Sequence, residues 1–215
     1  MNLPDLDLQW IYSRLAWGVV LAALLLRAWP RSTARMPRSA IGLGTAVCAA
    51  MWLPQGASPA YWLGLAFQYP SSMLVACCAF SLAARQGVVR GGPMREGWFS
   101  LVVALGGALL YADSSGWLNL GLYARGFDPL LGPTAALALG SWAVWSIRRH
   151  VGRDVGRGVG LVVLASVIVF CLTRLPSGNV FDAFLDPLLW AWALAATLAK
   201  AARRWRRSAQ PQSAA

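Results

Sequence analysis

The sequence predicts an all-α, polytopic integral membrane protein whose chain crosses a bilayer about seven times. The first observation is composition: of 215 residues, 58% are hydrophobic and 13% are charged, and the mean hydropathy is +0.53. A soluble domain carries roughly 25% charged residues, so this chain has too little polar surface to cover a core in water. The other two observations are the spacing of its apolar runs and the placement of its basic residues.

Seven apolar segments are separated by short polar stretches. In chain order they are 10–29, 39–53, 60–84, 98–112, 130–147, 155–172, and a last segment that begins between 180 and 187 and ends near 202. A spanning helix needs about 20 residues, within a range of about 17–25. The second and fourth segments are short by this measure, so we expect them to cross with little tilt or to recruit loop residues.

Basic residues alternate with these segments. A basic cluster follows the first, third, fifth and seventh segments, and six of the eight acidic residues lie at or near the opposite ends. The clusters are Arg27, Arg31, Arg35, Arg38; Arg85, Arg90, Arg95; Arg148, Arg149, Arg153, Arg157; and Lys200, Arg203, Arg204, Arg206, Arg207. Because cytoplasmic loops are enriched in Lys and Arg, the N-terminus is predicted outside and the C-terminus in the cytoplasm.

The expected organisation is one transmembrane bundle, residues 1–207, followed by a disordered cytoplasmic tail, 208–215. The chain opens with two aspartates and no basic residue, so we expect no cleavable signal peptide and a first segment that stays as a helix. Arginine outnumbers lysine 18 to 1, which fits a GC-rich coding sequence. We therefore expect a multi-pass protein of a bacterial-type inner (plasma) membrane.

Several chemistries have no support in the sequence. The net charge of +11 reflects topology clusters and does not indicate nucleic-acid binding. The four cysteines lie in apolar runs, where we expect buried, reduced thiols, and one histidine cannot build a metal or haem site, so neither metal nor cofactor is predicted. Walker A, H-E-x-x-H and G-x-S-x-G motifs are absent, and no charge lies centrally in a predicted helix, which disfavours ion-coupled transport and intramembrane acid–base catalysis.

The third segment is interrupted near its middle by a proline, Pro70, in the stretch 68–72. Proline removes a backbone hydrogen bond and kinks a helix. Interrupted helices with polar residues near the midplane occur at transporter binding sites, so Gln68, Tyr69 and Ser72 are candidate substrate-binding residues. The alternative is a kink without a site, in which Gln68 and Ser72 hydrogen-bond between helices. Trp17, deep in the first segment, is assigned to packing in preference to a cavity.

A second candidate cluster lies on the predicted outer side. Asp182 and Asp186 are four residues apart and would share one helix face, where two carboxylates can share a proton or bind a cation. Arg125 and Arg174 are predicted on the same side and can neutralise them. Asp128 and Asp186 each precede a proline at the start of an apolar segment, so helix capping is the preferred role for both. Asp182 is not explained as a cap and is the preferred functional carboxylate.

Two further features bear on partners. The outer stretch 113–129 is aromatic; it is either a lid or docking surface or, as we favour, a connector packed on lipid headgroups. Two rows of small residues allow close helix approach, within the fold or with a membrane-protein partner: Gly152, Gly156 and Gly160, and Gly42, Ala46 and Ala50.

Three functions are compatible with this sequence. The first is a non-enzymatic membrane subunit or accessory protein of an envelope assembly, favoured by the small size and the missing catalytic motifs. The second is a small-solute permease or facilitator that uses the region of Gln68 and the outer Asp/Arg cluster. The third is an enzyme acting on a lipid-linked substrate at the outer interface, with Asp182 or Asp186 and Arg174. A non-enzymatic role is preferred.

Overall fold

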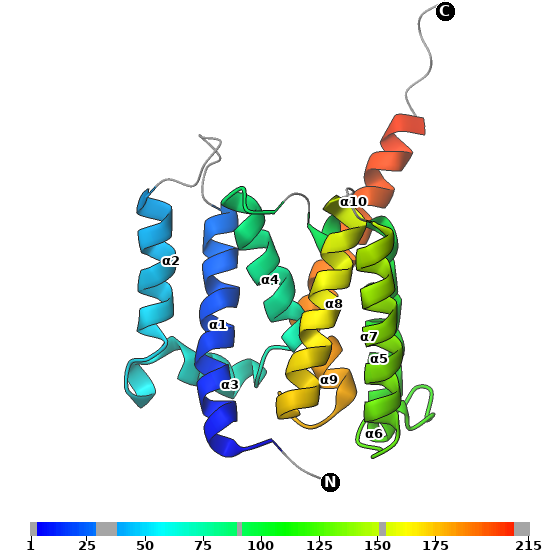
Figure 1. The fold of residues 1–215 in the computed structure, drawn as a ribbon, viewed down its shortest axis with the longest axis horizontal. Helices are drawn as coiled ribbons and strands as arrows, with labels where there is room; N and C mark the ends of the chain where they lie inside the picture. Colours follow the sequence, from blue (N-terminus) through cyan, green and yellow to red (C-terminus); the bar gives the residue numbers. More distant parts are fainter. Residues whose placement is uncertain (1–3, 29–37, 90–91, 151–153, 209–215) are drawn as a thin grey trace, which may run out of the picture.

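The computed structural model describes residues 4–28, 38–89, 92–150 and 154–208, and within them every regular element is helical (Figure 1). The α-helices are α1 (Leu6–Ala28), α2 (Arg38–Ala50), α3 (Pro59–Phe67), α4 (Ser72–Arg85), α5 (Gly97–Ser114), α6 (Leu122–Arg125), α7 (Leu131–Arg149), α8 (Asp154–Thr173), α9 (Val180–Phe184) and α10 (Pro187–Ser208). Two 3₁₀ turns, η1 (Gln55–Ala57) and η2 (Pro93–Arg95), join them. The predicted all-α class is confirmed.

The longer helices run alternately up and down in Figure 1, in the order α1, α2, α4, α5, α7, α8 and α10. The short helices α3, α6 and α9 lie toward the lower end of the bundle, and α10 extends beyond the other helices at the upper end. Among the described residues, three helices are long and apolar enough to cross a membrane: Leu6–Ala28, Gly97–Ser114 and Gly156–Thr173. Helices α2 and α4, with 13 and 14 residues, are shorter than the minimum of about 17.

The predicted third segment is two helices. α3 ends at Phe67 and α4 begins at Ser72, so the stretch around Pro70 is a complete break and not a kink. Gln68 has a positive φ of 61°, which turns the chain out of α3. The Ser71 hydroxyl then accepts a hydrogen bond from the Leu74 amide (3.0 Å) and caps α4. A serine cap directly after the proline makes a new helix start more favourable than continuation through it.

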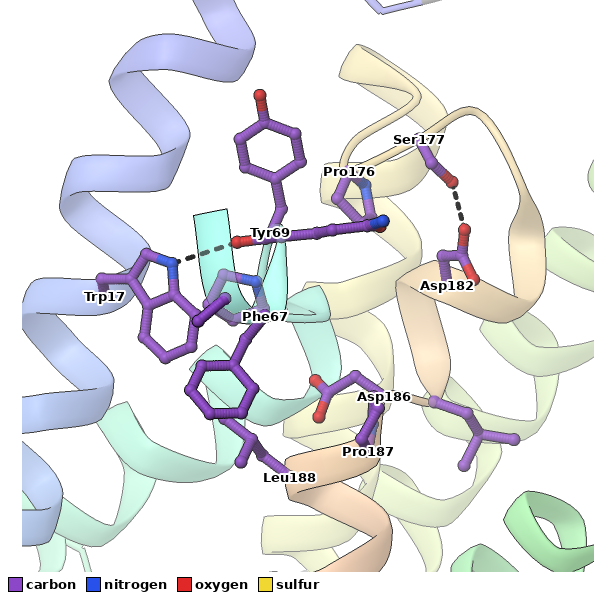
Figure 2. Close-up of a pocket in the computed structure, with 13 residues that line it drawn as sticks. Trp17, Phe67, Tyr69, Pro176, Ser177, Asp182, Asp186, Pro187 and Leu188 are labelled. Carbon is purple, nitrogen blue, oxygen red and sulfur yellow. Dashed lines mark hydrogen bonds between the residues drawn. The ribbon is translucent and has the colours of Figure 1, made fainter. Parts of the chain in front are cut away.

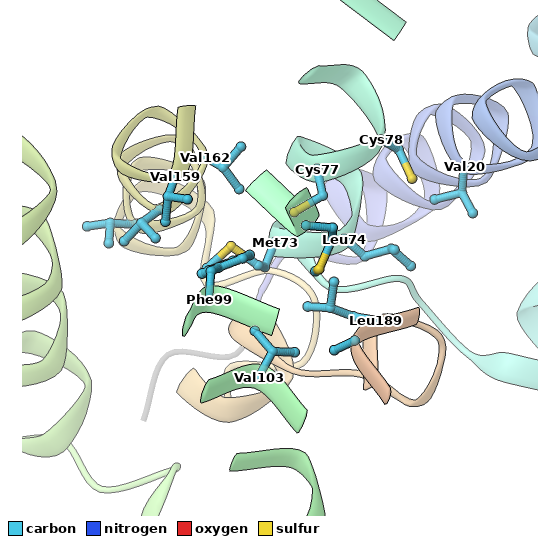
Figure 3. Packing of buried hydrophobic residues seen from close by; sticks show 14 of the residues in the cluster. Val20, Met73, Leu74, Cys77, Cys78, Phe99, Val103, Val159, Val162 and Leu189 are labelled. Carbon is cyan, nitrogen blue, oxygen red and sulfur yellow. The ribbon is translucent and has the colours of Figure 1, made fainter. Parts of the chain in front are cut away.

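The core forms where α1, α4, α5, α8 and α10 face one another (Figure 3). Its members are apolar, and they include Val20, Met73, Leu74, Cys77, Cys78, Phe99, Val103, Val159, Val162 and Leu189. All four cysteines are free, but the expectation that all are buried is wrong, because Cys171 is exposed on α8. Arg31, Arg35, Arg90, Arg153, Gly152 and the tail 209–215 lie outside the described residues.

One of the two small-residue rows packs inside the fold. A Cβ on Gly160 would lie 3.0 Å from the Ala143 carbonyl of α7, and Ser146 donates a hydrogen bond to the Gly156 carbonyl (3.4 Å). This row therefore lets α7 and α8 approach closely. The row on α2 differs, because Gly42 is exposed and has no atom within 4 Å of a Cβ placed on it.

Close packing of α5 on α10 depends on Gly107. A Cβ there would lie 2.7 Å from Trp190 Cγ, and the ring cannot yield easily because its Nε1 donates to the Ala104 carbonyl (3.0 Å) and it stacks on Tyr111. We expect Gly107→Ala to lower the free energy of unfolding by about 1–3 kcal/mol, read as a lower apparent Tm in detergent. Gly106→Ala is the control, since its Cβ meets only Leu185 at 3.5 Å. Equal Tm values for the two variants would contradict this packing.

Candidate functional site

A cavity of about 350 Å³ lies between α1, the break that separates α3 from α4, and the link between α9 and α10 (Figure 2). Four predicted site residues line it together: Gln68, Tyr69, Asp182 and Asp186. Part of each candidate cluster therefore lies on the same cavity, although the two clusters are more than 100 residues apart in the sequence. The volume is at the lower end of the range of about 300–1,000 Å³ typical of small-molecule sites.

Helix α1 fixes the wall of the cavity formed by the break. The Tyr12 hydroxyl donates to the Pro70 carbonyl (2.7 Å), and Trp17 Nε1 donates to the Gln68 carbonyl (3.2 Å). Ending α3 here removes the helical partners of backbone carbonyls, and in apolar surroundings each needs another donor. Trp17 is buried, as expected of a packing residue, and it also borders the cavity.

Asp186 joins the N-termini of two helices. Its Oδ1 accepts a hydrogen bond from the Leu189 amide (2.7 Å), which caps α10 as predicted, and its Oδ2 accepts one from the Ser71 amide (2.7 Å), directly before α4. Both helices direct the positive ends of their dipoles at this carboxylate. Asp186 is thus held by backbone donors on both oxygens, and its negative charge is offset by two helix termini.

Asp182 has a different environment. Its Oδ2 accepts hydrogen bonds from the Ser177 hydroxyl and from the Tyr123 hydroxyl, the latter at 2.9 Å. Figure 2 shows Ser177 and Asp182 together at one side of the cavity. Both donors are neutral, and no helix N-terminus is bonded to this side chain within the part of the chain that the structure describes. Asp182 lies in the first turn of α9, and no cationic side chain pairs with it among the described residues.

The remaining predicted site residues do not line the cavity. The Ser72 hydroxyl donates to the Ala183 carbonyl (2.8 Å) and ties α4 to α9. The Arg174 guanidinium lies over the Phe170 ring, 5.2 Å from its centroid, and Arg125 is exposed on α6. Neither arginine makes an ion pair with Asp182 or Asp186 among the described residues, so the expected neutralisation is not observed. Arg174, which follows the end of α8, instead makes a cation–π contact with Phe170 in the last turn of that helix.

Asp128 also differs from its predicted role. Its Oδ1 accepts a hydrogen bond from the Leu130 amide (2.7 Å), but α7 begins at Leu131 and Leu130 occupies the N-cap position. The aspartate therefore stabilises the turn that precedes the helix, where Asx side chains commonly bond the amide two residues on.

The loop between α5 and α7 holds Tyr123 against Asp182. Asp113, at the end of α5, accepts hydrogen bonds from the amides of Leu120 (2.6 Å), Gly121 (3.0 Å) and Tyr123 (3.2 Å). The buried Asn179 donates to the Tyr123 carbonyl (3.0 Å) from the other side. These residues were not identified from the sequence, because their amide partners are set by the loop conformation and not by any local pattern.

Neither a protein-family model, nor a curated protein, nor a solved structure matches this chain. The chemistry of the cavity is therefore what bears on function.

The charge on the cavity wall is negative. Two carboxylates line it, those of Asp182 and Asp186, whereas no Lys, Arg or His does so among the described residues. The rest of the lining is mostly aromatic, aliphatic or proline, with Gln68 and Ser177 as neutral polar groups. A mostly apolar lining with a few charged and polar groups is the usual composition of a small-molecule site.

The pKa of Tyr123 gives a measurable signature of its contact with Asp182. Burial raises this pKa, and the neighbouring Asp182 charge and hydrogen bond raise it further, to about 12. Since the unperturbed value is about 10, the stabilising contact is fully present below pH 10 and is lost as the pH rises through 12. We expect the difference in tyrosinate absorbance between the wild type and Tyr123→Phe to be centred near pH 12. A difference centred near pH 10 would mean that the contact is absent.

Proposed function

We propose that the protein is a multi-pass inner-membrane protein that takes a small polar solute into this cavity from the outer side, as a permease or facilitator does. Seven crossings with the N-terminus outside are part of this proposal, and the alternating helices and the charge distribution support them. Basic residues occupy the last turns of α1, α4, α7 and α10, which end at the upper side of Figure 1: Arg27; Arg85; Arg148 and Arg149; Arg206 and Arg207. The positive-inside rule makes that side cytoplasmic.

The observation that carries the proposal is the cavity at two helix starts inside the bundle. α4 and α10 begin beside each other at Asp186, and α3 and α9 precede them at the same end. Discontinuous helices of this kind form solute sites in transporters because their free backbone groups and dipoles lie within the bundle. Here four side chains predicted from the sequence meet at that point.

A blocking variant tests solute entry. Ala66 lines the cavity on α3 and is exposed, so Ala66→Phe should fill the cavity without breaking a hydrogen bond. The purified protein is screened for solutes that raise its Tm, with cationic, anionic and neutral compounds, and any hit is followed by uptake into proteoliposomes. We expect Ala66→Phe to abolish both responses and Ala138→Phe, at an exposed position on α7 outside the cavity, to retain them. If no compound of any class binds the wild type, the proposal fails.

The topology is tested separately with single cysteines. Ser114 lies at the proposed outer end of α5 and Ser208 at the cytoplasmic end of α10. In intact cells of a variant without native cysteines, a membrane-impermeant maleimide should label Ser114→Cys. Ser208→Cys should react only after the membrane is permeabilised. The reverse pattern would invert the orientation.

A second candidate, a non-enzymatic membrane subunit of an envelope assembly, is favoured by α2 and by the outer loop. α2 packs mainly on α1, and its other side exposes Ile41, Gly42, Thr45 and Ala46, where small residues permit a helix to approach. Trp117 in the outer loop is 83% exposed. A stoichiometric partner that co-purifies in mild detergent and is lost in Gly42→Leu would support this role.

A further inference from the structure

Asp182 is the more available of the two cavity carboxylates. Both oxygens of Asp186 accept backbone amides, from Leu189 and from Ser71, and its charge faces the N-termini of α10 and α4. Asp182 uses Oδ2 for both of its hydrogen bonds, and Oδ1 accepts none from the described residues. Both donors to Oδ2 are neutral, so the Asp182 charge is left to be paired by whatever enters.

Aromatic rings stand across the cavity from the carboxylates. Figure 2 shows Trp17, Phe67 and Tyr69 on the side of α1 and α3, and Asp182 and Asp186 on the side of α9 and α10. The Trp17 ring is fixed by its bond to the Gln68 carbonyl, and its centroid lies 6.1 Å from that of Phe67 at an interplanar angle of 53°. Tilted aromatic faces next to a carboxylate attract cations, and a desolvated ring–cation contact strengthens binding further.

The same lining discriminates between kinds of cation. Ca²⁺ requires 6–8 oxygen ligands and Mg²⁺ keeps several waters, whereas this cavity offers one unoccupied carboxylate oxygen amid aromatic, proline and leucine side chains. An organic cation needs far fewer polar partners, because its methyl or methylene groups pack on rings and its charge is spread over them. A volume of about 350 Å³ is large enough for such a molecule.

We propose that the ligand of this cavity is a small organic cation with an alkylammonium group, paired with Asp182 and packed on the rings of Phe67 and Tyr69. This inference rests on the proposed solute-binding function and assigns its substrate class. The alkylammonium group belongs either to a free solute or to the headgroup of an amine-containing lipid, and both present the same chemistry to the site.

Binding of choline to the full-length protein in phosphatidylglycerol nanodiscs is the test, with 3,3-dimethylbutan-1-ol as an uncharged molecule of the same shape. We expect the alcohol to bind about tenfold more weakly than choline, and Asp182→Asn and Phe67→Leu each to weaken choline binding by a similar factor. Asp128→Asn removes a carboxylate of the same outer face that is outside the cavity and should leave the affinity unchanged. Tm values of all variants confirm that they are folded.

The outcomes separate the two proposals. If an anionic or neutral solute binds in a manner blocked by Ala66→Phe, while choline does not bind, the alkylammonium class is wrong and the solute-binding function stands. Equal affinities for choline and the alcohol, or no effect of Asp182→Asn, also overturn the class. If choline binds and phosphatidylethanolamine in the nanodisc competes with it, the class holds and the natural source is a lipid headgroup; binding without competition identifies a free solute.

Discussion

Replacement of Asp186 with alanine is expected to be the most destabilising change to a single polar side chain of the site. It leaves the amides of Ser71 and Leu189 without acceptors and removes the charge that faces two helix N-termini. A lost cap costs about 1 kcal/mol and an unsatisfied buried donor about 1–3 kcal/mol, so we expect about 2–4 kcal/mol less stability. The measurement is the apparent Tm in detergent, together with the loss of helical circular dichroism.

Two further variants define the origin of this effect. Asp186→Asn keeps one carbonyl acceptor and should fall between the wild type and the alanine variant. Asp128→Ala removes a single exposed bond in the turn before α7 and should change the Tm only slightly. If Asp186→Ala and Asp128→Ala lower the Tm by the same amount, the double cap contributes nothing and the joint between α4 and α10 is wrongly described.

Gly126→Ala is expected to disrupt the packing of the end of α6 against the start of α9 as strongly. Gly126 has ordinary right-handed helical dihedrals (φ −60°, ψ −18°), so the cost is steric and not conformational. A Cβ would overlap Asn179 Oδ1 and approach Phe181 Cδ2 to 2.7 Å. Asn179 is fully buried, and its Oδ1 accepts the Phe181 amide (2.8 Å) that starts α9, so it has no free space to move into. Overpacking of this kind costs about 1–3 kcal/mol, and the lost hydrogen bonds add to it.

The same variant has a second readout. The Gly126 carbonyl accepts the Val180 amide (3.1 Å), and displacement of this pair should separate Tyr123 from Asp182. The tyrosinate absorbance step near pH 12 should therefore shift toward the ordinary value. Gly42→Ala, at an open helical position, is the control and should be neutral or stabilising by up to about 1 kcal/mol. A Gly126→Ala protein with wild-type Tm would show that the segment around Gly126 is not packed against residues 179–181.

Local sequence rules predicted the parts of this fold that depend on neighbours in the chain. Apolar length located α5, α7 and α8 to within two residues, and Asp186 before proline marked the start of α10. Pro70 marked an interruption, but whether a kink or a full break results depends on the Ser71 cap and on donors from α1. Those donors are distant in sequence, so no local pattern contains them.

The site shows the same division. Gln68, Tyr69, Asp182 and Asp186 were identified from residue type and spacing, because polar groups in apolar runs are few. Their meeting in one cavity depends on the bond between Ser71 and Asp186, which are 115 positions apart. The expected ion pair with Arg174 is not observed. Placement near the same end of the bundle does not determine which way a side chain points, and the Arg174 guanidinium lies over the Phe170 ring instead.

The bond between Ser71 and Asp186 also constrains how the protein can be assembled. During synthesis the residues around Pro70 are made well before Asp186, which supplies the acceptor for the Ser71 amide. Until Asp186 has been synthesised, the Ser71 amide lacks this acceptor and stays unsatisfied among apolar side chains. The segment from Asp186 to the end of α10 therefore completes the hydrogen bonding at the break. A chain that stops before this segment would keep the Ser71 amide unpaired and should be more open to proteolysis, although most of its helices are present.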